Sequence, residues 1–198
     1  MKPRQARLVR QTTETQVELE VSVDGQGRCE AQTGIPFLDH MLNLLAHHAR
    51  LDLVVRARGD LQVDDHHLVE DVGLVLGQAI REALGDKRGI ERYGWALLPM
   101  DEVLVAAAVD LGGRSSFSSN YAPQRTKVGD LSTEMVTHFF LSVAGELRAN
   151  LHLRFLAPVD NEHHRVEAMF KAFARALGAA VKLNPEVASQ VPSTKGVL

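Results

Sequence analysis

Cysteine and long apolar runs are scarce in this chain, and their absence excludes several classes of protein. The single cysteine, Cys29, cannot form a disulfide within the chain, so we expect a reducing compartment and a strand-packing role for this residue. No stretch approaches the roughly 20 apolar residues of a membrane-spanning helix, and the N-terminus lacks the apolar run of a secretory signal peptide. We therefore expect a cytoplasmic protein that has no membrane partner.

The chain also lacks an excess of charge of either sign. Its 22 Lys and Arg residues face 25 Asp and Glu residues, which gives a formal net charge of −3. A strongly basic surface is the usual mark of proteins that bind nucleic acid, so no nucleic-acid partner is expected. With 198 residues the chain can bury roughly 70% of its unfolded surface, and its size alone gives no reason to need a metal for folding.

What the chain has instead is one histidine and glutamate pattern that occurs twice. The segment 66–70 has the sequence HHLVE and the segment 163–167 has the sequence HHRVE. A solitary histidine precedes each copy at a nearly equal distance, His40 in the first case and His138 in the second. A single pair of histidines would be interpreted as a polar helix N-terminus, but matched offsets of these rarer residues indicate a duplicated metal site.

Helix geometry sorts the residues of each copy. Positions i and i+4 lie on one face of a helix, whereas adjacent positions point about 100° apart. The first histidine and the glutamate can therefore bind one ion, and the second histidine points elsewhere. If the halves pack about a pseudo-two-fold axis, each second histidine can complete the ion site of the other half. An alternative is that His67 pairs with Glu70 at i and i+3.

The types of ligand limit the metal and its role. Imidazole suits Zn, Cu, Fe and Ni, while carboxylate oxygen shifts the preference toward harder ions such as Mn. No cysteine lies near either copy, so a closed, cysteine-rich zinc site is not expected. Four protein ligands on an octahedral ion would leave two positions for substrate or water, which favours catalysis. The predicted ligands are His40, His66, His67, Glu70, His138, His163, His164 and Glu167.

Apolar patterns predict the same order of elements in both halves. The first half is expected to contain a hairpin of strands 16–23 and 28–33, helices 36–48 and 66–84, and a strand at 51–57. The second half is expected to contain strands 96–98, 103–111 and 150–156, helices 131–147 and 161–182, and a surface loop at 115–124. This order predicts an α+β fold with an internal duplication, in which each half is a β-sheet covered by two helices.

The boundaries of the two halves follow from the repeated order. The glycines that flank segment 89–94 favour a junction there, which gives a first half at 1–90 and a second half at 91–184. Both belong to one compact domain, and residues 185–198 are expected to form a mobile C-terminal tail.

Five segments, in order along nearly the whole chain, are specific enough to indicate a family. They are GIPFLDHML (34–42), DDHHLVEDVGLVLGQAI (64–80), PMDE (99–102), NEHHRVEAMFKAFARAL (161–177) and PSTKG (192–196). Together they resemble imidazoleglycerol-phosphate dehydratase, a lyase of histidine biosynthesis. The resemblance implies dehydration of D-erythro-imidazoleglycerol phosphate to imidazole acetol phosphate, with two Mn²⁺ ions per active site that bind and activate the imidazolate ring.

The resemblance also implies a ligand set and an assembly. Family subunits form a homo-oligomer, a 24-mer built from trimers, and neighbouring subunits share each active site. Metal and assembly would then be interdependent. One ion would bind His40, His67, His163 and Glu167, and the other would bind His66, Glu70, His138 and His164.

The family pattern assigns roles to further residues. Glu14 would transfer a proton or hold the glycerol hydroxyls, although by itself it would be an ordinary exposed strand residue. Glu70 and Glu167 would act at the catalytic centre as metal ligands, and Asp71 could hydrogen-bond a ligand histidine. The phosphate would be bound by His48, Arg92, Arg114, Lys171, Ser193, Thr194 and Lys195, and the tail would order over it.

The chain departs from the family pattern at three places. Segment 156–160 replaces a shorter glycine-containing turn, Leu44 replaces a polar residue that is commonly Gln, and Gly112 replaces a more usual Ser.

Two other functional classes remain as alternatives. A dinuclear phosphoesterase would use similar ligands but more bridging aspartates. A metal-storage oligomer would need the histidines and glutamates but not Arg92, Arg114 or the tail.

Overall fold

Each half of the chain begins with a hairpin and continues with a strand, helix, strand and helix. The computed structural model describes residues 3–157 and 160–198. Along β2, every second residue is buried and faces the helices, which is the alternation that a half-covered strand requires. The elements of the first half are β1 (Gln5–Gln11), β2 (Thr15–Ser22), β3 (Cys29–Gln32), α1 (Pro36–Ala49), β4 (Asp52–Gly59) and α2 (His66–Leu84).

The second half repeats this series with one insertion, the short pair β8 (Lys127–Val128) and β9 (Leu131–Ser132). The strand order is β1-β2-β4-β3 in the first sheet and β5-β6-β10-β7 in the second, so corresponding strands occupy corresponding places. In both sheets only the pair next to the crossover helix, β3 with β4 or β7 with β10, is parallel. The other elements are β5 (Tyr93–Met100), β6 (Val103–Asp110), β7 (Ser116–Ser119), α3 (Thr133–Leu147), β10 (Asn150–Phe155), α4 (Glu162–Ala180) and the 3₁₀ turn η1 (Pro185–Val187).

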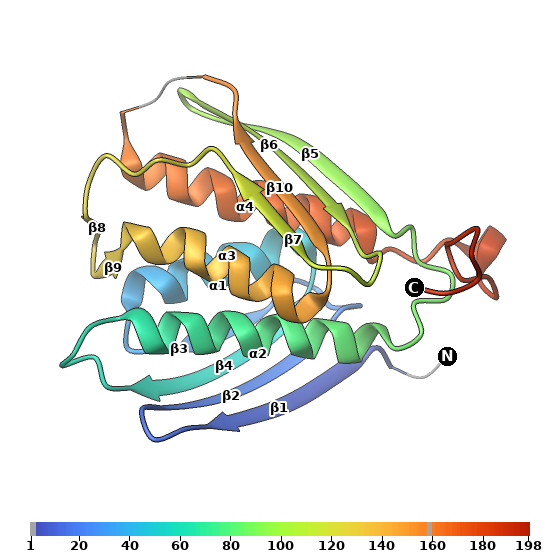
Figure 1. Cartoon of the computed structure of the whole chain (residues 1–198), viewed down its shortest axis with the longest axis horizontal. Helices are drawn as coiled ribbons and strands as arrows, with labels where there is room; N and C mark the ends of the chain where they lie inside the picture. Colours follow the sequence, from blue (N-terminus) through green and yellow to red (C-terminus); the bar gives the residue numbers. More distant parts are fainter. Residues whose placement is uncertain (1–2, 158–159) are drawn as a thin grey trace.

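The helices lie between the two sheets, as Figure 1 shows. Helix α2 packs along α3, and α1 packs along α4, so each contact joins one half to the other. The contact with α3 is close because of glycine: a Cβ on Gly77 would lie 2.5 Å from the carbonyl oxygen of Val143. The predicted α+β fold and its internal duplication are confirmed.

The ends of the helices also repeat. Arg50 after α1 and Arg148 after α3 both adopt the left-handed conformation, with φ of 58° and 52°. Their backbone N–H groups donate to the last carbonyl oxygens of their helices, which is a common way for a helix to end. Each helix is therefore followed at once by a strand of its own half, β4 after α1 and β10 after α3. As a result, α2 and α4 begin at equivalent places in the two halves.

Two predictions about strands were wrong. Strand β3 does not form a hairpin with β2, because β4 lies between them and pairs with both. The hairpin partner of β2 is β1, an edge strand with many exposed residues whose pattern gave no strong signal. The predicted loop 115–124 contains β7, which pairs with β10. Strand pairing depends on crossover connections that periodicity alone does not report.

Three further predictions concern Cys29, the segment 156–160 and membrane-spanning helices. Cys29 is half-buried in β3, and burial, followed by the charges of Asp39 and Glu30, raises the pKa of its thiol to about 11. Of the segment 156–160, residues 158 and 159 lie outside the described residues. None of the helices in the described ranges is long and apolar enough to cross a membrane.

Candidate metal centres and substrate site

Helices α1 and α4 bring the first group of predicted ligands together. His163 and Glu167, one turn apart on α4, lie 3.0 Å apart between Nε2 and Oε2, and His40 of α1 places its Nε2 3.7 Å from the same oxygen. Burial disfavours the charged form of Glu167, but Lys171, His163 and His40 outweigh it, so the pKa of Glu167 lies below its ordinary value. We call these three residues, His40, His163 and Glu167, the α1–α4 cluster.

Helices α2 and α3 form the equivalent group in the other pairing of halves. Glu70 lies between two histidines: its Oε2 is 3.8 Å from Nε2 of His66, and its Oε1 is 3.2 Å from Nε2 of His138. The rings of His66 and His138 are 4.7 Å apart between centroids. We call these residues, His66, Glu70 and His138, the α2–α3 cluster. Its members, like those of the α1–α4 cluster, come from two helices that belong to different halves.

Both clusters have the chemistry of a metal site. In each, two imidazole nitrogens and one carboxylate oxygen lie within 4.8 Å of one another. Paired histidine and glutamate can also form a simple hydrogen bond, but the same three donors recur at both crossings of the duplicated helices. The donors are nitrogen and oxygen without a thiolate, which suits a borderline or hard divalent ion. The residues therefore fit a metal ion at each cluster.

The second histidine of each pair belongs to neither cluster, and His164 instead forms a third group of possible ligands with Asp101 and Glu102. Nδ1 of His67 lies 3.1 Å from Oδ2 of Asp60, and Nδ1 of His164 lies 3.1 Å from Oε1 of Glu102. Because a carboxylate only accepts, Nδ1 donates in each pair, and Nε2 of the neutral ring then has a lone pair for an ion. The hydrogen bond that the His67 ring donates to Asp60 also raises the pKa of His67. Both rings are thus held through Nδ1, with Nε2 turned away from the carboxylate.

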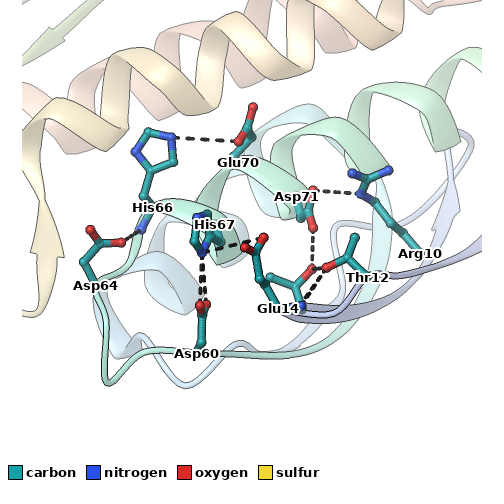
Figure 2. Close-up of polar contacts among 10 residues, drawn as sticks. Arg10, Thr12, Glu14, Asp60, Asp64, His66, His67, Glu70 and Asp71 are labelled. Carbon is teal, nitrogen blue, oxygen red and sulfur yellow. Dashed lines mark hydrogen bonds and ion pairs between the residues drawn. The ribbon is translucent and has the colours of Figure 1, made fainter.

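Glu14 lies on the turn between β1 and β2, beside His67. Figure 2 shows its carboxylate facing the His67 ring, and Oε2 is 3.9 Å from Nδ1. Half of the Glu14 side chain, 52%, is exposed to solvent. The turn is shaped by Thr12, whose hydroxyl oxygen accepts hydrogen bonds from the backbone N–H groups of Glu14 and Thr15. A carboxylate in this place can accept a proton or hydrogen bonds from a bound hydroxyl.

The predicted phosphate ligands Arg92 and Arg114 lie far from the clusters of the same chain. Arg92 donates its backbone N–H to the carbonyl oxygen of Ala180, at the end of α4, whereas His163 is at the start of that helix. At 1.5 Å per residue these positions are separated by about 25 Å. Arg114 is exposed and follows β6 at the same end as Arg92. One chain therefore does not bring its clusters and these arginines together.

The C-terminal tail lies at this second end. Figure 1 shows the C-terminus opposite the N-terminal ends of α2 and α4. Arg92 holds the tail through Nη1, which donates to the carbonyl oxygen of Pro192 at 2.9 Å, and pairs with Asp110 through Nε at 2.7 Å. Ser193, Thr194 and Lys195 follow Pro192 directly. The tail residues and the two arginines thus share one surface region.

Lys171 and His48 lie between the α1–α4 cluster and the end of the molecule that carries Arg92. Lys171, one turn beyond Glu167, places its Nζ 2.5 Å from Oε1 of that carboxylate. His48 ends α1, and burial, followed by the charges of His47, Lys171 and Arg175, lowers its pKa. Lys171 and Arg175 supply positive charge along the contact of α1 with α4, next to the α1–α4 cluster. An anionic group on a ligand would be stabilised there.

Comparisons with known proteins now decide the family. Residues 33–177 match imidazoleglycerol-phosphate dehydratase. The chain is 52% identical to that enzyme from Chloroherpeton thalassium, with 100% of both covered, and 52% identical to that from Methanopyrus kandleri, with 98% of this chain and 96% of the relative covered. The chain belongs to the imidazoleglycerol-phosphate dehydratase family. It is accordingly a hydro-lyase of histidine biosynthesis that acts on a small molecule.

Solved dehydratase structures agree with this assignment. The structure from Staphylococcus aureus superimposes with a TM-score of 0.82 and 39% identity, covering 91% of this chain and 99% of that one. The structure from Pyrococcus furiosus, in complex with (S)-C348, gives a TM-score of 0.82 at 34% identity, with 96% and 100% covered. The duplicated α+β architecture is therefore shared with dehydratases whose structures are known.

Sequence reasoning missed several neighbours of the predicted site residues. Asp60 and Glu102 had no assigned chemistry, although the PMDE motif that contains Glu102 contributed to the family resemblance. Asp71 was expected near a ligand histidine, but its carboxylate contacts Arg10 and Thr15 instead. Asp71 points from α2 toward β1 and β2, which a helical repeat cannot reveal without the position of the sheet.

Two departures from the dehydratase family pattern have a structural place. Leu44 is partly buried against the core beneath α1. Gly112 lies beside the pair formed by Arg92 and Asp110, where a Cβ would be 2.8 Å from Nη2 of the arginine. Glycine thus leaves room for this ion pair to approach the backbone closely.

Proposed function

We propose that the chain converts D-erythro-imidazoleglycerol phosphate to imidazole acetol phosphate with two Mn²⁺ ions. The observation that carries this proposal is the pair of equivalent three-donor clusters, one at each crossing of helices from the two halves. When bound, the ions would supply Lewis acidity and a template for the imidazole ring of the substrate. One ion would be held by His40, His67, His163 and Glu167, and the other by His66, Glu70, His138 and His164.

The protein side chains would bind the ions, act on the substrate and orient the ligand histidines. Glu70 and Glu167 supply the negative charge in each ligand set, and their i, i+4 spacing to a histidine fixes them on rigid helices. Glu14, beside His67, is placed to accept the substrate proton or to hold the glycerol hydroxyls. Asp60 and Glu102 hold the rings of His67 and His164 with Nε2 free for an ion.

The active site would be completed by more than one copy of the chain. His67 and His164 lie outside the clusters of their own chain, and Arg92 and Arg114 lie about one helix length from them. Both facts are accounted for if a neighbouring copy supplies the missing ligands and the phosphate-binding arginines. This arrangement supports a homo-oligomer with active sites between subunits, which we propose is a 24-mer built from trimers.

The substrate phosphate would lie where the arginines and tail of one copy meet His48 and Lys171 of a neighbouring copy. Arginine offers a planar pair of donors that suits phosphate oxygens, and lysine adds a point charge. Because Arg92 already holds Pro192, the tail is poised to order over the phosphate when substrate binds. The proposed phosphate ligands are His48, Arg92, Arg114, Lys171, Ser193, Thr194 and Lys195.

Mixing two defective variants tests the proposed shared site. Arg114→Ala should lower kcat/KM about 10-fold to 100-fold through loss of a charge-assisted contact, and Glu167→Gln should lower metal binding. In oligomers reassembled from both variants with Mn²⁺, about one quarter of the sites would combine an intact Glu167 from one copy with an intact Arg114 from another. We expect activity at low substrate concentration to exceed the average of the two parents. Arg125→Ala, at an exposed loop position, is the control.

The same experiment separates the enzyme from a metal store. An Arg114→Ala variant with normal kcat/KM would remove this residue from substrate binding. Mixed oligomers no more active than the average of their parents would show that each site takes both Glu167 and Arg114 from one chain. Metal content measured in parallel should stay normal in Arg114→Ala, since this arginine lies far from the clusters of its own chain.

A further inference from the structure

The two copies of the repeated motif differ at the residue that follows the glutamate. The first copy has Asp71 after Glu70, and the second has Ala168 after Glu167. Asp71 is only 6% exposed, and Ala168 is fully buried at the corresponding place on α4. A buried carboxylate is costly unless it is paired, so a small apolar residue would be the default at such a position. The charge in the first half therefore calls for a reason.

Asp71 joins α2 to both sides of the β1–β2 turn. Its Oδ1 accepts a hydrogen bond from Nε of Arg10 at 2.7 Å, and its Oδ2 accepts a very short hydrogen bond from the hydroxyl of Thr15. Arg10 belongs to β1 and Thr15 is the first residue of β2. Figure 2 shows Asp71 and Arg10 facing each other, above Glu14 in this view. One buried carboxylate thus ties both strands of the hairpin to the helix of the α2–α3 cluster.

The hydrogen bonds continue from Thr15 to Glu14. The hydroxyl groups of Thr15 and Thr12 lie 3.1 Å apart, and the Thr12 oxygen also accepts the backbone N–H of Glu14 at 3.1 Å. The chain of contacts therefore runs from Asp71 through two threonine hydroxyls to the backbone of Glu14. Since Thr15 is 5% exposed, water does not compete strongly for its hydroxyl. The turn is held in place from its buried side.

We propose that Asp71 is a positioning residue that fixes the Glu14 carboxylate relative to the metal-binding face of α2. The inference rests on the proposed role of Glu14 in the reaction. It also explains the difference between the halves: the corresponding turn of the second half, which carries Asp101 and Glu102, faces a helix with Ala168 in place of the carboxylate. The duplicated halves would then share metal binding, while only the first holds its turn by this contact for the reaction.

Substitution of Thr15 tests the inference without touching a metal ligand. Thr15→Val keeps the shape of the side chain but removes the hydroxyl, whereas Thr15→Ser keeps the hydroxyl and serves as the matched control. We expect Thr15→Val to lower kcat on the order of 10-fold to 100-fold, with Mn²⁺ content and assembly unchanged, because small displacements of a reacting group are costly. Thr15→Ser should stay within about twofold of the parent chain.

A double-substitution cycle with Glu14→Gln distinguishes positioning from general support of the fold. If Asp71 acts through Glu14, Thr15→Val should cause little further loss of kcat once Glu14 is Gln. An equal loss in both backgrounds, or equal kcat for Thr15→Val and Thr15→Ser, would overturn the inference. Asp71→Asn, which keeps the shape of the side chain but weakens the pair with Arg10, provides a second variant should Thr15→Val fail to assemble.

The failure of the underlying proposal would look different. Glu14→Gln with unchanged kcat would remove Glu14 from the reaction, and the positioning role of Asp71 would fall with it. A large loss in Glu14→Gln combined with normal kcat in both Thr15→Val and Asp71→Asn would leave the role of Glu14 intact and overturn the positioning role alone.

Discussion

Glu167→Gln is expected to lower kcat on the order of a thousandfold or more and to reduce the Mn²⁺ bound per chain from two ions toward one. Glu167 supplies the carboxylate of the α1–α4 cluster, where His163 and His40 approach the same oxygen. The amide keeps the size of the side chain but not its charge, so it is a weak ligand for a hard ion. Loss of one ion removes several kcal/mol of charge stabilisation from the transition state. Metal analysis and steady-state kinetics measure both effects.

The control for this substitution is Glu82→Gln. Glu82 lies near the end of α2, contacts Gln78 and is remote from both clusters, so metal content and kcat should be unchanged. A Glu167→Gln variant that retained two ions and normal turnover would show that this carboxylate is not a ligand. A variant that lost one ion but kept its kcat would instead remove that ion from the reaction.

Glu14→Gln should lower kcat by about 10²-fold to 10⁴-fold while leaving two Mn²⁺ ions bound. Glu14 does not belong to either cluster, yet its carboxylate lies 3.9 Å from His67 and is half exposed toward solvent. A group in this place can act on the substrate without serving as a metal ligand. The size of the expected loss is that of a general acid or base. The decisive measurement is kcat together with metal content.

Glu20→Gln provides a matched control on the same hairpin. Glu20 lies on β2, pairs with Arg7 on the outer face of the sheet, and is 45% exposed. Its replacement should leave kcat within about twofold, as is usual for an exposed surface position. Should Glu14→Gln raise KM while kcat stays normal, Glu14 would bind the glycerol hydroxyls without transferring a proton. Normal values of both would exclude it from the site.

The sequence was sufficient to predict which candidate ligands lie side by side on one helix. His66 with Glu70, and His163 with Glu167, follow from i, i+4 spacing, which needs no knowledge of tertiary structure. The duplication was also visible, because rare residues recur in order. From the duplication we expected the second histidine of each pair to complete the site of the other half, but within one chain His67 and His164 lie in neither cluster. It is the solitary His138 of α3 that lies beside Glu70 of α2.

Other features depend on long-range contacts that a single sequence does not report. The pairing of β3 with β4 follows from a crossover connection, and the edge strand β1 is too exposed to show a strong pattern. The distance between Arg92 and the clusters follows from the length of α4 and the place of β5 beside its end. The contacts of Asp71 required the side on which the hairpin lies to be known.

The arrangement of the halves gives a physical account of how a duplicated chain acquires one reaction. The helix contacts α1 with α4 and α2 with α3 are equivalent, so both create a cluster of two histidines and one glutamate. The turns that lie next to the clusters are not equivalent, since only that of Glu14 is tied to its helix by a buried carboxylate. The proposed metal binding thus follows the symmetry of the fold, while the contacts of Asp71 break it.

Titration of the metal-free chain with Mn²⁺ tests the central claim most directly. Conversion of imidazoleglycerol phosphate should be measured together with molar mass by light scattering at each Mn²⁺ concentration. We predict that turnover appears only as the chain binds two ions and assembles beyond a trimer, because His67, His164 and the arginines must come from neighbouring copies. Full turnover by metal-free protein, or by chains that remain separate with both ions bound, would contradict the account.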